Sequence, residues 1–104
     1  MKVQFNTDKT ISGDQRSTEY FTDFISEGLR HHSDHITRVE AHLSDENGNK
    51  EVANDIKCLL EARVEGKKPI AVTAKADTVE MAVSHAIDKL NAALETVLGR
   101  LKSH

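Results

Sequence analysis

The sequence predicts an α+β fold in which two helices pack on one face of a four-stranded mixed sheet, in the order βαβββα. Four segments alternate apolar and polar residues, which is the pattern of strands with one buried and one exposed face. Residues 77–104 instead repeat their apolar residues at helical spacing, so this helix needs an equally long apolar surface to lie on. Since each strand offers one apolar face, both helices are expected to share it.

The terminal helix has a continuous apolar stripe, because its large apolar residues recur at intervals of four and three positions: Val83, Ile87, Leu90, Leu94, Val97 and Leu101. At about 3.6 residues per turn these positions fall on one side of a helix. Either Asp77 or Thr78 can cap the first turn, and Glu80, three positions after Asp77, fits a capping box.

The first strand is predicted at residues 2–6, where polar and apolar residues alternate. A polar loop follows, and Ser17 or Thr18 is expected to open the first helix. The large residues of that helix recur at helical spacing: Tyr20, Phe21, Phe24, Ile25 and Leu29. They are expected to anchor it on the sheet, and the helix is expected to weaken over residues 28–34.

Three more strands are predicted at residues 36–43, 56–64 and 70–76. Asn47-Gly48 indicates a reversal in the first gap, and the Gly-Lys-Lys-Pro segment at 66–69 a turn in the second. Because a helix joins the first two strands, they can lie parallel through a right-handed crossover, whereas the last three form an antiparallel meander.

The second face of the sheet is expected to meet solvent or a partner, and carries Arg38, His42, Lys57, Arg63, Thr73 and Lys75. Leu59 is an apolar exception on that face and indicates either a bulge or a contact surface. Glu40 and Glu61 can face each other across adjacent strands. Their basic neighbours are expected to pair with them, so a salt-bridged surface is favoured over a catalytic carboxylate pair.

Length and composition indicate one domain spanning residues 1–104. No apolar run is long enough to enter a membrane, so the chain is expected to be cytoplasmic and to have no membrane partner. Cys58 is the single cysteine, which excludes an internal disulfide and fits a reducing compartment. The net charge of −3 argues against a strongly basic nucleic-acid binder.

No enzyme, cofactor or small-molecule substrate is predicted, because no catalytic or phosphate-binding motif is present. His31 and His35 are weak candidates for a metal site, being four positions apart with Glu27 one turn earlier. A solvated helix end is preferred for them. Strand alternation places Cys58 inward and His42 outward, which argues against a Cys–His catalytic pair.

Basic residues gather locally although the chain as a whole is acidic. Between residues 56 and 76 two acidic residues stand against five basic ones: Lys57, Arg63, Lys67, Lys68 and Lys75. Arg100 and Lys102 follow at the end of the last helix. Such a patch either binds RNA phosphates or is a solvated face.

Three stretches resemble a known family: VQFNT in the first strand, ITRVEAHLSDENG in the second, and AVSHAIDKLNAALETVLGRLK in the last helix. The family comprises the ribosome hibernation-promoting factors and ribosome-associated translation inhibitors, in their short form. The resemblance covers essentially the whole chain. It implies a fold similar to that of double-stranded-RNA-binding domains. It also implies a cytoplasmic protein that binds the small ribosomal subunit and its 16S rRNA, and that inhibits translation under stress.

The resemblance carries over Lys89, Arg100 and Lys102 as RNA-binding positions, in addition to the patch above. Family members are typically basic along both helices, whereas residues 91–98 here contain no basic residue. This departure leaves open a weaker or differently targeted ribosome binder. The alternative is a protein-interaction module of the same fold that has lost ribosome binding and forms a homodimer through a sheet edge. An additional C-terminal domain, as in long family members, is not expected.

Overall fold

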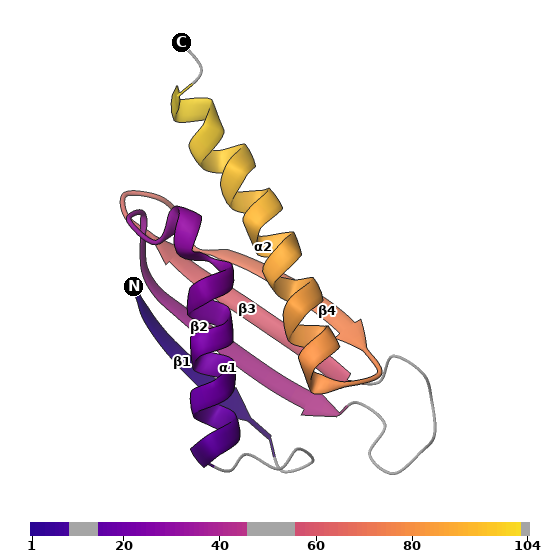
Figure 1. The fold of residues 1–104 in the computed structure, drawn as a ribbon. Coiled ribbons are helices and arrows are strands. Elements are labelled where there is room, and N and C mark those ends of the chain that lie inside the picture. The colour runs from indigo at the N-terminus through magenta and orange to yellow at the C-terminus, as the bar shows by residue number, and fades with distance from the viewer. Residues whose placement is uncertain (9–14, 46–55, 103–104) are drawn as a thin grey trace.

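The computed structural model describes residues 1–8, 15–45 and 56–102 of the chain, with side chains as far as Gly99. The elements follow the predicted order, with a short 3-10 helix, η1, added after the first helix (Figure 1). They are β1 (Lys2–Thr7), α1 (Gln15–Gly28), η1 (Arg30–His32), β2 (Ile36–Asp45), β3 (Ile56–Val64), β4 (Ile70–Ala76) and α2 (Val79–Lys102). The predicted α+β fold is confirmed. The Asn47-Gly48 reversal lies outside the described residues.

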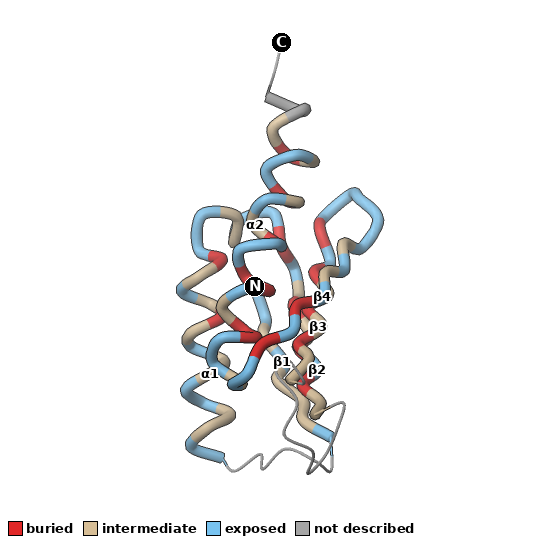
Figure 2. Tube along the Cα trace, turned by 90° about the vertical axis from the view of Figure 1, so that its right-hand side faces the viewer, coloured by how far each residue is buried: buried red, intermediate tan, exposed pale blue. Residues whose placement is uncertain are grey.

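The strands lie in the order β1-β2-β3-β4, with β1 parallel to β2 and the other pairs antiparallel. Because α1 connects the parallel pair, it crosses over one face of the sheet, and α2 lies on the same face (Figure 1). Seen from the side, both helices stand on one side of the strands, and the other face of the sheet is left open (Figure 2). α1 packs on β1, and α2 on β3 and β4.

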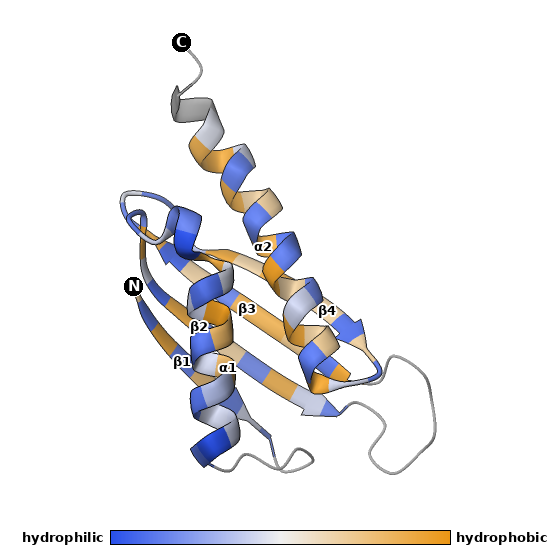
Figure 3. Cartoon of the chain, in the orientation of Figure 1, coloured by the Kyte–Doolittle hydropathy of each residue, from blue (hydrophilic) through white to orange (hydrophobic). Residues whose placement is uncertain are grey.

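The core lies between the helices and the sheet, as the alternation predicts. On β3 the inward residues Cys58, Leu60, Ala62 and Val64 are buried, and polar residues lie between them except at Leu59. Figure 3 shows the resulting mixture of hydrophobic and hydrophilic positions along the strands. The stripe of α2 meets them with buried residues at each turn: Val83, Ile87, Leu90, Leu94 and Leu98. Each large aliphatic side chain buried in this way contributes roughly 1.5–3 kcal/mol.

The ends of the helices differ in detail from the sequence-based expectation. α1 begins at Gln15, ahead of the predicted Ser17 or Thr18. For α2, the Thr78 Oγ1 accepts a hydrogen bond of 3.1 Å from the Met81 backbone N–H, so Thr78 acts as the cap. Glu80 accepts a hydrogen bond of 3.0 Å from the Tyr20 hydroxyl of α1.

α1 and α2 approach closely at the end of α1. The Asn91 side-chain amide donates a hydrogen bond of 2.9 Å to the Gly28 carbonyl. A Cβ at Gly28 would lie only 2.8 Å from Cγ2 of Ile87, so this position accepts no side chain without movement. None of the described helices is long and apolar enough to cross a membrane.

Candidate nucleic-acid interface

The predicted RNA-binding residues on the open face lie at two ends of the sheet, not in one patch. Lys57 and Lys75 are register partners at the end where β3 begins. Arg63 lies at the other end of β3, about 20 Å away along the strand. Lys67 and Lys68 follow in the β3–β4 turn, beside Arg63. The structure therefore brings Arg63, Lys67 and Lys68 together and separates them from Lys57 and Lys75.

The β3–β4 turn presents its two lysines at its tip. Gly66 has a φ of 75°, a conformation that a residue without a side chain adopts readily. The Lys67 N–H then donates a 3.0 Å hydrogen bond to the Val64 carbonyl and closes the turn. Both Lys67 and Lys68 are exposed, so their ammonium groups can reach a phosphate outside the molecule.

An acidic row separates the two ends. Glu40 and Glu61 are register partners in β2 and β3. The Glu40 carboxylate lies 3.5 Å from Arg38 Nε, a pairing that the sequence predicted. It also lies 3.7 Å from His42 Nε2, a neighbour that the sequence did not predict. The Arg38 guanidinium also donates to the side-chain oxygen of Gln4. Glu40 thus has its counter-charge within the sheet.

The segment between α1 and β2 carries Arg30, His31 and His35 and lies next to the β3–β4 turn. The Glu65 N–H donates a 2.9 Å hydrogen bond to the His35 carbonyl, and the Thr37 hydroxyl donates a 3.2 Å bond to the Arg63 carbonyl. The first bond holds the α1–β2 connector against the turn, and the second joins β2 to β3 beside it. Both lie at the same end of the sheet, and the last turns of α2 extend beyond it (Figures 1 and 2).

Within this connector, Arg30 pairs with Glu27 at 3.3 Å, and both side chains are well exposed. Lys2 joins the same end, because it is the register partner of Arg38. We call this region the basic end, and define it by Lys2, Arg30, His31, His35, Arg38, Arg63, Lys67 and Lys68.

Lys89, carried over from the family resemblance, lies elsewhere. Its ammonium donates a 2.8 Å hydrogen bond to the Thr73 carbonyl of β4, across the outer edge of the sheet. Lys89 is exposed and keeps further N–H donors that can meet a phosphate. Arg100 and Lys102 belong to the final turns of α2, and their side chains lie outside the described part of the structure.

The two histidines considered for a metal do not share a helix face. His31 lies in η1, whereas His35 lies in the turn between η1 and β2, since α1 has ended at Gly28. Among the described residues, no group of three or more His, Cys, Asp or Glu side chains is arranged to hold a metal ion.

Cys58 lies inward and is fully buried, whereas His42 lies on the open face, so the two do not form a Cys–His pair. Burial raises the pKa of the Cys58 thiol to about 12. The thiol therefore stays protonated at neutral pH and behaves as a small apolar core residue.

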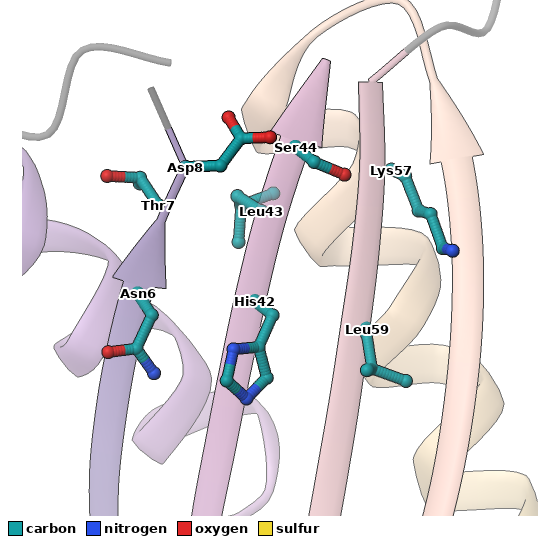
Figure 4. A pocket seen from close by; sticks show the side chains of 8 residues that line it. All are labelled: Asn6, Thr7, Asp8, His42, Leu43, Ser44, Lys57 and Leu59. Carbon is teal, nitrogen blue, oxygen red and sulfur yellow. The ribbon is translucent and has the colours of Figure 1, made fainter. Parts of the chain in front are cut away.

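A hollow opens on the open face at the end away from the basic end. It has a volume of about 230 Å³ and lies among residues 6–8 of β1 and its extension, residues 42–44 of β2, and Lys57 and Leu59 of β3 (Figure 4). Sequence patterning flagged Leu59 but could not find the hollow, because the hollow depends on the register of three strands.

Sequence patterning also missed Lys2 and Arg38 as members of a basic end. Their proximity depends on the parallel register of β1 and β2, which no turn between the strands specifies. The connector residues Arg30 and His35 were missed for a related reason. Nothing local indicates that the connector lies against the β3–β4 turn.

Comparison with known protein families shows to which family the chain belongs. The family model described as Sigma 54 modulation protein / S30EA ribosomal protein matches residues 10–102. The chain belongs to this family. The resemblance drawn from the sequence stretches is thereby confirmed, and the S30EA family is non-enzymatic, in line with the absence of a catalytic motif.

Solved structures share the fold. The N-terminal domain of Thermus thermophilus Protein Y superposes with a TM-score of 0.71 at 12% identity, covering 93% of this chain and 99% of that one. A ribosomal subunit interface protein from Coxiella burnetii gives 0.66 at 15% identity and covers 100% of both chains. At these identities the likeness shows the fold alone. The sequence matches none of the curated proteins with which it was compared.

Proposed function

We propose that this S30EA-family chain is a ribosome-associated factor that binds the rRNA of the small subunit and inhibits translation during hibernation or stress. The observation that carries the proposal is the basic end, where exposed Arg63, Lys67 and Lys68 gather in a chain whose net charge is −3. Such a chain is expected to approach RNA with this end toward the phosphates. A factor of this kind works on cytoplasmic ribosomes, and its 104 residues act as one domain.

The family and the fold support the ribosome as partner. The chain matches the S30EA ribosomal protein model, and a protein of the same fold is titled a ribosomal subunit interface protein. The basic end supplies what RNA docking needs, because Lys67 and Lys68 lie at the tip of a turn and meet no steric barrier. Exposed Glu65 and Asp34 lie among these groups and lower the local positive charge, so binding is expected to be weaker than on a fully basic surface. Because Lys and Arg contacts to phosphates supply the binding, it is expected to weaken further as the salt concentration rises.

Co-sedimentation with isolated small ribosomal subunits tests the proposal. The single variants Lys67→Glu and Lys68→Glu are each expected to remain in the supernatant at salt concentrations where the wild-type chain still pellets, and each changes the net charge by as much as the control does. The control is Arg16→Glu, which reverses an exposed charge at the start of α1, away from the basic end. A wild-type chain that fails to pellet even at low salt would refute ribosome binding. Equal loss in the control would show that overall charge, not the basic end, decides it.

A further inference from the structure

Leu59 is an apolar residue on the open face, and the strand pairing does not explain why it lies there. The β2–β3 register is continuous through it, since His42 pairs with Leu59 and the register shift lies between Ile36 and Arg38. A bulge therefore does not explain its outward position. Leu59 belongs to a cross-strand row without Asp, Glu, Lys or Arg, Asn6–His42–Leu59–Thr73, set beyond the acidic row of the sheet.

The hollow described above opens over this row. Half of the His42 side chain is exposed (49%), and Figure 4 shows His42 and Leu59 side by side on neighbouring strands. The volume of about 230 Å³ lies below the roughly 300–1,000 Å³ typical of pockets that enclose a whole small-molecule ligand. The hollow therefore suits one ring system that remains attached to something outside.

The chemistry around the hollow fits a nucleotide. The imidazole of His42 and the apolar Leu59 form a surface on which a base can stack, as bases do on histidine and aromatic side chains in RNA-binding sheets. Lys57 projects from the same face of β3, two residues and about 7 Å from Leu59, a span that a ribose can bridge. Lys75, its register partner, adds a second positive charge for a phosphate.

Polar groups at the rim can read the base or the sugar. The Asn6 amide donates to the Ala41 carbonyl at 3.3 Å, which fixes its orientation beside the hollow. The Ser44 hydroxyl and the Asp8 carboxylate also line the hollow. A carboxylate accepts hydrogen bonds from ribose hydroxyls or an exocyclic amine, but it repels a phosphate. The phosphate is therefore expected on the Lys57 side and the sugar or base edge toward Asp8.

We propose that this hollow binds a single nucleoside 5′-phosphate unit, with its base over Leu59 and His42 and its phosphate at Lys57. This inference rests on the RNA-binding function proposed above. The nucleotide would be an unpaired base of a bound RNA strand, at a distance from the basic end. A free nucleotide presents the same chemistry, and the experiment distinguishes the two.

Chemical-shift mapping of the ¹⁵N-labelled chain tests the site directly. Titration with a short uridine oligonucleotide and, separately, with uridine 5′-monophosphate is expected to shift residues 6–8, 42–44 and 57–59. Tighter binding of the oligonucleotide supports RNA as the source. Equal binding of the monophosphate supports the same site for a free nucleotide. Shifts confined to the basic end, or no shifts with either probe, would overturn the site.

Two variants sharpen the result. Leu59→Ser removes the apolar surface and is expected to weaken oligonucleotide binding at least about fivefold. Lys57→Gln is expected to weaken it and to lower the salt slope by about one unit. Arg63→Gln, at the basic end, is the matched control and should leave the shifts of the hollow unchanged. Since these measurements do not use ribosomes, loss of the site leaves subunit binding through the basic end untouched, and the two failures are distinguishable.

Discussion

Gly28 shows how a single residue sets the distance between the helices. It ends α1 against Ile87 of α2, and its carbonyl accepts the hydrogen bond from Asn91. A methyl group there would lie 2.8 Å from Cγ2 of Ile87, a branch that cannot rotate away without disturbing its own rotamer. The close approach, not backbone flexibility, is what requires glycine here.

Gly28→Ala is therefore expected to destabilise the fold by about 1–3 kcal/mol through overpacking. Gly99→Ala is the matched control, because nothing lies within 4 Å of a Cβ there. Since Gly99 is inside a helix, alanine should stabilise it by roughly 0.5–1 kcal/mol. Urea unfolding followed by circular dichroism measures both. Equal effects of the two substitutions would contradict the close contact.

Burial of the Cys58 thiol is expected to make the free energy of unfolding depend on pH. Its pKa is raised from 9.0 to about 12 by burial, so the folded state retains the thiol proton that the unfolded state loses. The stabilisation is complete below pH 9 and declines as pH rises from 9 towards 12. The unfolding free energy of the wild-type chain should therefore fall more steeply across this range than that of Cys58→Ala. Parallel curves would mean that the thiol is not protected in the core.

At the scale of elements, α2 is stabilised by a cap at its first turn and by contacts with the sheet along its length. Thr78 caps the helix with its hydroxyl, as one of the two residues that the sequence offered. Along the edge of the sheet, Lys89 reaches over β4 to the Thr73 carbonyl. An edge strand with unpaired backbone groups is a surface on which another chain can pair, and a lysine over it discourages that pairing.

Thr78→Ala is expected to cost about 1 kcal/mol, because the Met81 N–H loses its partner at the helix end. Thr96→Ala serves as the control. Its hydroxyl donates to the Ala92 carbonyl within the helix, where alanine is the better helix former and little change is expected. Chemical denaturation compares the two. A cost at Thr96 as large as at Thr78 would argue against capping.

Lys89→Met is expected to increase self-association, because it leaves the Thr73 carbonyl at the β4 edge without this donor. Sedimentation velocity over a concentration series measures the change. Lys68→Met makes the same replacement in the exposed β3–β4 turn and should leave the mass unchanged. If both variants associate alike, added hydrophobicity is the cause and the edge is not.

At the scale of the whole molecule, the helices and strands could be predicted from the sequence. Which charged residues lie together in the folded sheet could not be predicted. Alternation and helical spacing are local, and they identified β3 and the buried stripe of α2. Lys57 and Lys67 are near in sequence, yet they lie at opposite ends of the sheet because β3 is extended. Lys2 and Arg38 are far apart in sequence, yet they are register partners. The basic end and the hollow exist only after the strands pair.

The basic end is proposed to make the phosphate contacts with small-subunit RNA. The most direct measurement is the slope of log K against log salt concentration for small-subunit binding, in charge-neutralised variants. Lys67→Gln/Lys68→Gln is predicted to lower the slope by about two units, and Lys57→Gln/Lys75→Gln by about one or less. An unchanged slope in the Lys67→Gln/Lys68→Gln variant would contradict docking through the basic end.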